Sequence, residues 1–182
     1  MSEQPQVLSG SELDNGGFVG ETIQVALVSD DLYGAIDNLV ALGVGPWMIY
    51  DVGPHNAVDL HYKGEPAEFS MRLAFTNLGS MTWEVIEPTG GPNIYQDFLD
   101  AGSKGLHHIA IGCNDTSYEE RAAELRKRGY EEVMGGRTFN GEVRMGYWHN
   151  GREDSPWVEI FVLPPDFGPE PDEWYPAPPP AA

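Results

Sequence analysis

Apolar and polar residues alternate along the chain in a pattern that occurs twice. The first copy opens with Gln24-Val-Ala-Leu-Val-Ser-Asp-Asp31 and continues as a helical stretch closed by Gly43. The second opens with His108-Ile-Ala-Ile-Gly-Cys-Asn-Asp115 and continues as a helical stretch closed by Gly129. Because the two openings have the same length and are followed by the same kind of segment, we interpret the chain as an internal repeat.

Each opening predicts a strand, since β-branched and apolar residues dominate it and turn-type residues end it. Asp30 or Asp31 can cap the first helix, and Ser117 with Glu120 fits a capping box at the start of the second. Basic residues in the last turn of the second helix complement the helix dipole. The apolar face of the first helix is formed by Leu32, Ala35, Ile36, Leu39, Val40 and Leu42.

Three further strands are expected in each copy, so each copy has the order βαβββ. They are expected at 45–50, 69–77 and 82–87, and at 131–134, 143–148 and 157–163. One such unit would leave a face of its sheet uncovered, so the two should pack together and enclose a cleft between curved sheets. The predicted fold class is α+β, with two βαβββ modules at about 22–100 and 105–163 in a single domain over 22–163.

The two ends of the chain lack this pattern. Residues 1–21 are interpreted as a flexible N-terminal segment, and residues 164–182 as an acidic, proline-rich tail that is not a folded element. Three aromatic residues lie among the prolines of the tail, Phe167, Trp174 and Tyr175. They could dock on a groove of the protein while the proline-rich backbone stays extended.

Strand alternation brings polar residues to the predicted cleft. Gln24 shares a strand face with Ala26, and His108 shares one with Ala110, so small neighbours leave room beside each polar side chain. The opposite face carries Val25, Leu27, Ile109 and Ile111, which we expect to pack against the helices.

The last strand of each copy carries a carboxylate inside an apolar run, Glu84 in the first and Glu159 in the second. A buried carboxylate is costly unless it is paired or binds a cation. Gln24, Glu84, His108 and Glu159 would together suit a borderline or hard divalent ion, and the absence of thiolates argues against a structural zinc site.

The chain from Thr22 to Leu163 resembles the vicinal oxygen chelate superfamily, which includes glyoxalase I, methylmalonyl-CoA epimerase, extradiol dioxygenases and bleomycin-resistance proteins. The motifs that carry the resemblance are Gly105-Leu-His-His-Ile-Ala-Ile111, and Phe75-Thr-Asn-Leu-Gly79 followed by Trp83-Glu-Val-Ile-Glu-Pro88. They are most similar to the glyoxalase-related, epimerase-like branch.

The resemblance implies that Gln24, Glu84, His108 and Glu159 are ligands of a divalent metal ion such as Zn, Ni, Co, Mn or Fe. It also implies an isomerase, epimerase or lyase whose substrate chelates the ion through two neighbouring oxygens while a base removes the α-proton. Glu159 is the first choice for the base and Glu84 the second. Epimerases typically have His where this chain has Gln24, which is a departure from their pattern.

Four further residues are weaker candidates for substrate binding. Arg72 and Arg144 lie in apolar strands and could hold a substrate carboxylate, or they could simply balance acidic side chains. Trp148 could line the cleft or belong to the core, and His149 follows it at a strand end. His107 should face away from His108 on the strand and is interpreted as structural or surface-exposed.

Two other functions stay open. A metal-free protein on the same scaffold could sequester an aromatic or antibiotic-like ligand without chemistry. Extradiol ring cleavage normally uses two His and one carboxylate on iron, and Gln24 removes one of those imidazoles.

Composition limits the partners. The chain has 10 Lys and Arg against 29 Asp and Glu, a net charge of −19 that repels nucleic acid. No apolar run approaches the roughly 20 residues of a membrane helix. Because the N-terminus lacks a secretory pattern and Cys113 is the only cysteine, we expect a cytoplasmic protein. The expected partner is a small-molecule substrate. A homodimer is the expected assembly, and the cleft could be completed within one chain or by exchange of modules between two.

Overall fold

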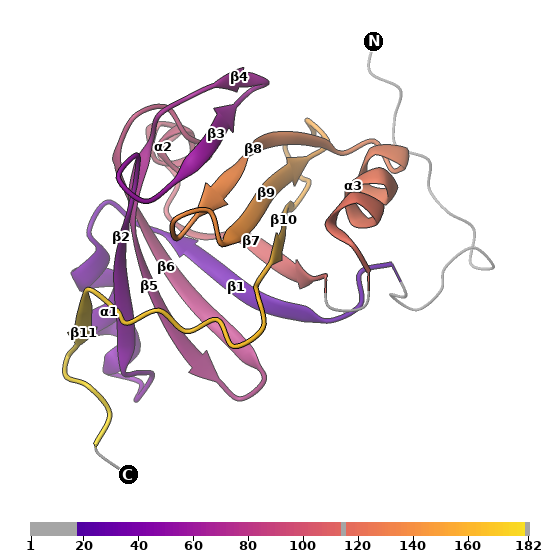
Figure 1. The fold of residues 1–182 in the computed structure, drawn as a ribbon. Helices are drawn as coiled ribbons and strands as arrows, with labels where there is room; N and C mark the ends of the chain where they lie inside the picture. Colours follow the sequence, from indigo (N-terminus) through magenta and orange to yellow (C-terminus); the bar gives the residue numbers. More distant parts are fainter. Residues whose placement is uncertain (1–17, 114–115, 181–182) are drawn as a thin grey trace.

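The computed structural model describes residues 18–113 and 116–180, which form one strongly curved sheet with three helices (Figure 1). The strands are β1 (Thr22–Val28), β2 (Trp47–Val52), β3 (Val58–Tyr62), β4 (Glu65–Pro66), β5 (Ser70–Leu78), β6 (Met81–Gly90), β7 (Gly105–Gly112), β8 (Glu131–Thr138), β9 (Val143–His149), β10 (Trp157–Val162) and β11 (Glu173–Tyr175). The helices are α1 (Leu32–Val40), α2 (Ile94–Asp100) and α3 (Tyr118–Lys127). The helices α1 and α3 cover the outer face of the sheet, whereas α2 packs against the inner apolar cluster. None of these helices is long and apolar enough to cross a membrane.

The sheet consists of two halves with the same topology. In the first half β1 runs parallel to β6, which pairs antiparallel with β5, and β5 pairs antiparallel with β2. In the second half β7, β10, β9 and β8 repeat this arrangement. Antiparallel pairing of β1 with β7 joins the halves, so one chain forms the whole sheet. The predicted α+β fold with two βαβββ modules is confirmed.

Each outer edge of the repeat is covered by a strand from the other half. The β3–β4 hairpin, which follows β2 in the chain, pairs with β8, while β11 at the C-terminal end pairs with β2. These additions protect edges that would otherwise expose unpaired backbone groups. The sequence pattern did not predict β3, β4, β11 or α2.

The interpretation of the ends needs a correction. Residues 173–175 form β11, so the tail is not wholly without folded structure. Its three residues are too few to show an alternation, and the surrounding prolines favour a loop. At the other end Phe18 packs beneath α3, with the Arg128 guanidinium 4.3 Å from the ring centroid. Residues 1–17 of the predicted flexible segment, Asn114 and Asp115 of the second opening, and residues 181–182 of the predicted tail lie outside the described residues.

The helices begin as the sequence predicts but cover different strands from those expected. Asp31 caps α1, and Ser117 with Glu120 forms a complete capping box on α3. Ile111 is buried under α3. However, α1 packs on β2, β5 and β6, so Val25 and Leu27 of β1 are only half-buried, as is Ile109 of β7. The apolar contact surface of α1 therefore lies further from the centre of the sheet than expected.

The outer layer of the first half depends on α1. Ile36 is fully buried against Trp47, Ile49, Ala74 and Val85. We predict that Ile36→Ala lowers the free energy of unfolding by about 2–4 kcal/mol, because the substitution leaves a cavity in this cluster. Urea denaturation measures the change. Leu42→Ala, at a side chain that is 78% exposed just after the same helix, is the control and should change it by less than about 0.5 kcal/mol; equal losses for the two variants would contradict this packing.

Candidate metal and substrate site

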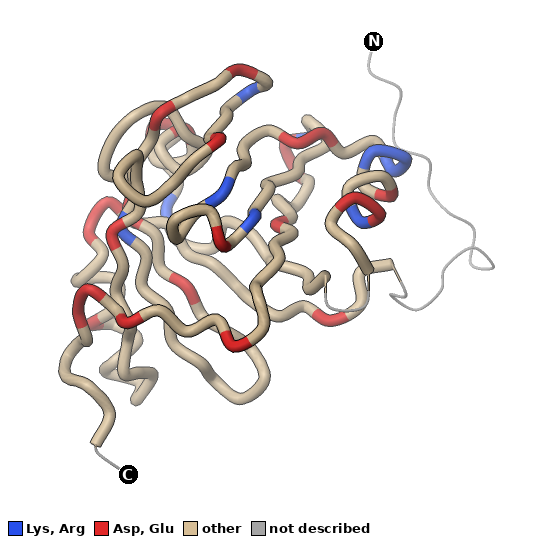
Figure 2. Tube along the Cα trace, in the orientation of Figure 1, with Lys and Arg blue, Asp and Glu red and all other residues tan. Residues whose placement is uncertain are grey.

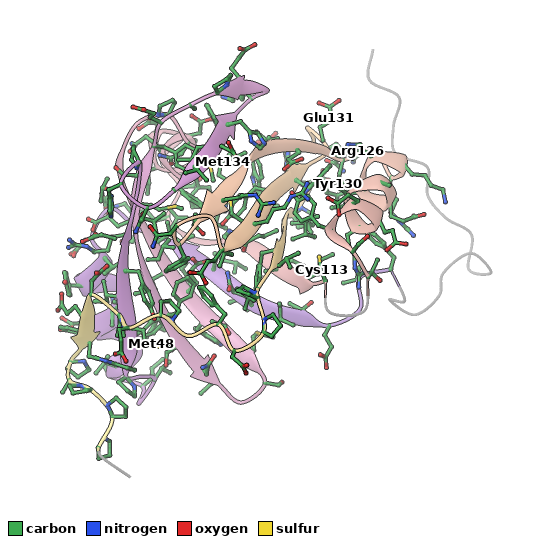
Figure 3. The ribbon with its side chains drawn as sticks, in the orientation of Figure 1. Met48, Cys113, Arg126, Tyr130, Glu131 and Met134 are labelled. Carbon is green, nitrogen blue, oxygen red and sulfur yellow. The ribbon has the colours of Figure 1, made fainter. Side chains whose placement is uncertain are left out.

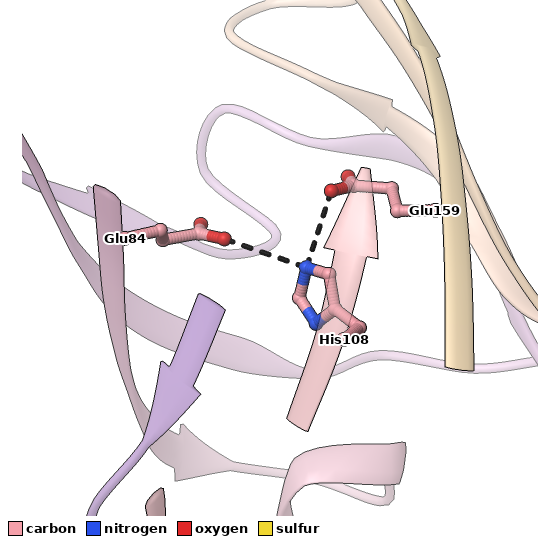
Figure 4. Close-up of side chains that lie close together, drawn as sticks. All are labelled: Glu84, His108 and Glu159. Carbon is pink, nitrogen blue, oxygen red and sulfur yellow. Dashed lines mark ion pairs between the residues drawn. The ribbon is translucent and has the colours of Figure 1, made fainter. Parts of the chain in front are cut away.

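Four polar side chains from four adjacent strands meet in the middle of the sheet. They are Gln24 on β1, Glu84 on β6, His108 on β7 and Glu159 on β10, and all are buried. Gln24 Nε2 donates to Glu84 Oε2 at 2.8 Å and to Glu159 Oε2 at 3.2 Å. His108 Nε2 lies 3.2 Å from Glu159 Oε2 and 3.6 Å from Glu84 Oε2 (Figure 4). The structure thus brings together the four residues singled out from the sequence, all within one chain.

The strand register explains why these side chains meet. Ala26 on β1 is flanked by His108 and Glu84 on the neighbouring strands. The equivalent Ala110 on β7 is flanked by Gln24 and Glu159. Residues in register carry their side chains on the same face of a sheet, and each alanine is small enough to leave space above it. The arrangement has approximate twofold symmetry about the β1–β7 pair.

Burial and close contact perturb the ionisation of this cluster. Burial raises the pKa of Glu84 to about 7, with a further increase from the charge of Glu159. Burial alone would lower the pKa of His108, but the nearby Glu159 and Glu84 carboxylates outweigh it and raise that pKa to about 9. Two carboxylates therefore share one imidazolium, and an excess of negative charge remains when both carboxylates are ionised.

The donor set fits a divalent cation. One ligand atom each from Glu84, His108 and Glu159 lies within 4.8 Å of the other two. His108 Nε2 is buried and makes no hydrogen bond of good direction, although two carboxylates lie close to it. Imidazole nitrogen and carboxylate oxygen suit ions such as Zn²⁺, Mn²⁺ and Fe²⁺. The Gln24 amide can join them through its oxygen if it rotates by half a turn.

The His107 ring contacts the His108 ring, although adjacent residues of a strand are expected to face in opposite directions. The pairing of β7 with β1 shifts register between Ala26 and Leu27, and this irregularity breaks the strict alternation. The two Nδ1 atoms lie 3.0 Å apart. Burial strongly lowers the pKa of His107, whose ring also stacks on Trp157. His107 is therefore neutral at physiological pH and can accept a hydrogen bond from His108 Nδ1.

An apolar cavity of about 530 Å³ opens above the cluster. Gln24, Glu84 and Glu159 lie among its lining residues, while Tyr50, Met71, Leu73, Phe75, Phe139, Met145, Tyr147 and Phe161 form much of its wall. Its size is within the range of about 300–1,000 Å³ that is typical of small-molecule sites. The C-terminal segment also contributes to the wall, which the sequence suggested only as docking of its aromatic residues on a groove.

The weaker substrate-binding candidates do not line this cavity. Arg72 forms two hydrogen bonds with Asp51, and Arg144 pairs with Glu119 and lies over Tyr118. Both arginines alternate with cavity residues on their strands, so they point to the opposite face.

The other two candidates also lie outside the cavity. Trp148 is fully buried in the cluster beneath α3. His149 stacks on Trp157 at a centroid distance of 4.4 Å. Sequence reasoning missed Tyr147, which lines the cavity with its ring 5.1 Å from that of His108; its alternation with Met145 on β9 was the available signal.

The chain forms two βαβββ modules in one curved sheet, and imidazole and carboxylate groups lie beside the axis that relates the two modules. These features define a protein of the vicinal oxygen chelate type. The chain belongs to the Glyoxalase/Bleomycin resistance protein/Dioxygenase superfamily, whose family model matches residues 23–147. No curated protein sequence matches the chain significantly.

Solved structures share the fold at low sequence identity. A hypothetical protein from Bacillus halodurans C-125 is 19% identical with a TM-score of 0.58, over 78% of this chain and 92% of that one. A variant of Streptomyces coelicolor methylmalonyl-CoA epimerase in complex with 2-nitronate-propionyl-CoA is 17% identical with a TM-score of 0.53, over 82% and 99%. The Mycobacterium tuberculosis methylmalonyl-CoA epimerase is also 17% identical with a TM-score of 0.53, over 79% and 88%. These similarities establish the fold.

The raised pKa of His108 predicts how stability depends on pH in chelator-treated protein. Because the folded pKa of about 9 exceeds the ordinary 6.5, the stabilisation is fully present below pH 6.5 and is lost as the pH rises through 9. Glu84, raised from 4.5 to about 7, acts in the same direction at lower pH. We expect the free energy of unfolding in urea to fall by at least about 1 kcal/mol between pH 6.5 and 9.

The control for this experiment is His55→Gln, which changes an exposed histidine outside the site and should leave the slope unaltered. An NMR titration of the His108 ring protons should show its midpoint near the upper end of the same pH range. A free energy of unfolding that stays constant or rises with pH would contradict the proposed charge state of the cluster.

Proposed function

We propose that this protein is a metal-dependent enzyme that removes a proton from a carbon atom next to a carbonyl group. The reaction class is isomerisation, epimerisation or elimination, on a small molecule with two neighbouring oxygens. The observation that supports this proposal is the convergence of Glu84, His108, Glu159 and Gln24 at the base of an apolar cavity. The superfamily and the shared fold of the methylmalonyl-CoA epimerases favour the same chemistry.

Glu84, His108 and Glu159 would hold the metal ion, with the Gln24 amide oxygen as a fourth ligand. A bound divalent ion supplies Lewis-acid polarisation of a carbonyl oxygen. Of the ions that suit these ligands, we propose Zn, Ni, Co, Mn or Fe. His107 would keep the His108 ring in position by accepting a hydrogen bond from Nδ1, which leaves Nε2 directed between the two carboxylates.

Glu159 is our first choice for the base, with Glu84 as the alternative. Both carboxylates border the cavity, and they occupy equivalent positions in the two halves. Burial raises the pKa of Glu84 to about 7, which makes this carboxylate a stronger base than one in water. The proton can return to the same carbon from the opposite face, which is epimerisation, or to a neighbouring carbon, which is isomerisation. In an elimination, removal of the proton is followed by loss of a leaving group.

The apolar wall has a role in this chemistry. Phe75 lies opposite Glu84 on the neighbouring strand and Tyr147 lies opposite Glu159, so an aromatic ring from each half of the sheet limits the water that reaches the polar cluster. A proton taken by the base is then returned to substrate rather than exchanged freely with solvent. We further propose that the protein is cytoplasmic and forms a homodimer.

Solvent deuterium exchange tests the proton-transfer step. The probe is 2-hydroxyacetophenone, which has neighbouring carbonyl and hydroxyl oxygens and α-protons visible by NMR. We expect the metal-loaded protein to accelerate incorporation of deuterium at the α-carbon, and Glu159→Gln to slow it by at least about 100-fold, since a general base typically contributes 10²–10⁴-fold. Glu65→Gln, at an exposed glutamate on β4, is the matched control and should retain full exchange.

The metal content of each variant must be measured with the exchange rate. Loss of exchange in Glu159→Gln with the metal retained assigns the base to Glu159, and the same result for Glu84→Gln assigns it to Glu84. A metal-loaded protein that binds the probe without accelerating exchange would contradict the proposal and favour sequestration of a ligand.

A further inference from the structure

The C-terminal segment, residues 163–175, forms one wall of the cavity. Leu163, Phe167, Pro169, Glu170 and Trp174 all lie among its lining residues. In Figure 1 this segment leaves β10, crosses in front of the sheet and reaches β11 beside β2. We call residues 163–175 the C-terminal wall.

The C-terminal wall is held in place by specific contacts. In the pairing of β11 with β2, Trp174 lies opposite Met48, another cavity residue, which Figure 3 shows beside the segment. Tyr50 Oη donates to the Pro169 carbonyl at 3.0 Å. The Asp51 backbone N–H donates to Asp172 Oδ2 at 2.8 Å, and the Asp172 N–H donates to the Ile49 carbonyl at 2.9 Å. The wall is therefore anchored along β2.

The side chains that the wall presents to the cavity are mainly apolar. The Phe167 ring packs edge-on against the Phe139 ring, with 5.2 Å between the ring centroids. The Phe139 ring packs in turn against the Tyr50 ring, with 5.3 Å between their centroids. These rings continue the apolar surface formed by the sheet. A ligand in the cavity would thus meet aromatic groups on the side opposite the sheet, which favours a ligand with a ring or a comparable apolar body.

The charged side chains that line the cavity are all acidic. Its ionisable carboxylates are Glu84 and Glu159 at the base and Glu170, which is exposed, at the mouth. All ten Lys and Arg residues of the chain fall within the described ranges, and none lines the cavity. Figure 2 shows them on α3 and other elements, whereas the C-terminal wall carries only acidic charges. A divalent ion held by two carboxylates, a neutral imidazole and an amide is formally neutral, so it would not supply an excess positive charge.

We propose that the cavity takes an uncharged, largely apolar substrate with a ring, and that the C-terminal wall selects it. Phe167 and Trp174 supply the apolar contacts, while Glu170 and the absence of a lining cation disfavour carboxylates and phosphates. The inference rests on the proposed function only in one respect, that the substrate carries two neighbouring oxygens. Selection by the C-terminal wall does not require a metal. The phosphate groups of a coenzyme A ester would find no cationic partner in this cavity.

The experiment compares two ligands that differ at one group, p-cresol and 4-hydroxybenzoate, by isothermal titration calorimetry on the metal-free full-length protein at pH 7. Replacing methyl by carboxylate should weaken binding by at least about tenfold, because the charged group is desolvated without a cation to pair with. Trp174→Ala and Phe167→Ala should each weaken p-cresol binding by about three- to tenfold. Trp83→Ala, at a half-buried tryptophan outside the cavity, is the control and should not.

Glu170→Gln tests the charge at the mouth. It should strengthen binding of 4-hydroxybenzoate by about two- to threefold, the modest effect expected for a solvent-exposed charge, and leave p-cresol unchanged. Glu65→Gln, which changes an exposed glutamate away from the cavity, should alter neither affinity. Tighter binding of 4-hydroxybenzoate than of p-cresol, or unchanged p-cresol affinity in both wall variants, would overturn the proposal.

A second ligand separates failure of this inference from failure of the proposed function. Loading with Mn²⁺ should strengthen binding of 4-methylcatechol, which has two neighbouring oxygens, by about tenfold or more relative to p-cresol. Preference for p-cresol over 4-hydroxybenzoate without this gain would support the wall and contradict the metal site. The gain without the preference would do the reverse.

Discussion

Two buried carboxylates, Glu84 and Glu159, face one imidazole in the middle of a continuous sheet, and the arrangement of the site follows from this imbalance of charge. His108 can offset one negative charge, and the Gln24 amide can donate hydrogen bonds but carries no charge. Lys and Arg side chains, all within the described ranges, do not reach the cavity. A divalent cation would balance both carboxylates and would replace the unsatisfied His108 Nε2 contact with a ligand bond.

The fold meets this demand through symmetry. Ala26 lies between His108 and Glu84 on the neighbouring strands, and Ala110 lies between Gln24 and Glu159. This register places the four polar side chains above the β1–β7 pair. A larger side chain at either alanine would fill the space that the polar groups share. The same pairing joins the modules into one curved sheet, so the concave surface that surrounds the cluster belongs to a single chain. Stability of the sheet and geometry of the site therefore depend on the same strand contacts.

Sequence reasoning predicted what depends on short-range periodicity and missed what depends on distant partners. The strands and helices of both modules, and the meeting of Gln24, Glu84, His108 and Glu159, follow from alternation and from the repeat. In contrast, β3 and β11 are stabilised by pairing with the opposite half, and three residues of β11 among prolines have no pattern of their own. The role of the four residues as ligands is still a prediction.

For Arg72 and Arg144 the sequence leaves two roles open, and the structure shows the second, in which each balances an acidic side chain. The alternation of Met71 with Leu73 and of Val143 with Met145 places both arginines on the face opposite the cavity. At His107 the same rule fails because the register of β7 is irregular there, and a local break in pairing cannot be seen in one sequence.

The central claim is that Glu84, His108 and Glu159 form a metal site, and elemental mass spectrometry of the purified protein tests it most directly. We expect near-stoichiometric divalent metal in the unaltered protein and its loss in His108→Ala, with His55→Ala as a control that retains it. A protein that contains no such metal and takes up none after exposure to Mn, Co, Ni, Zn or Fe would contradict the account.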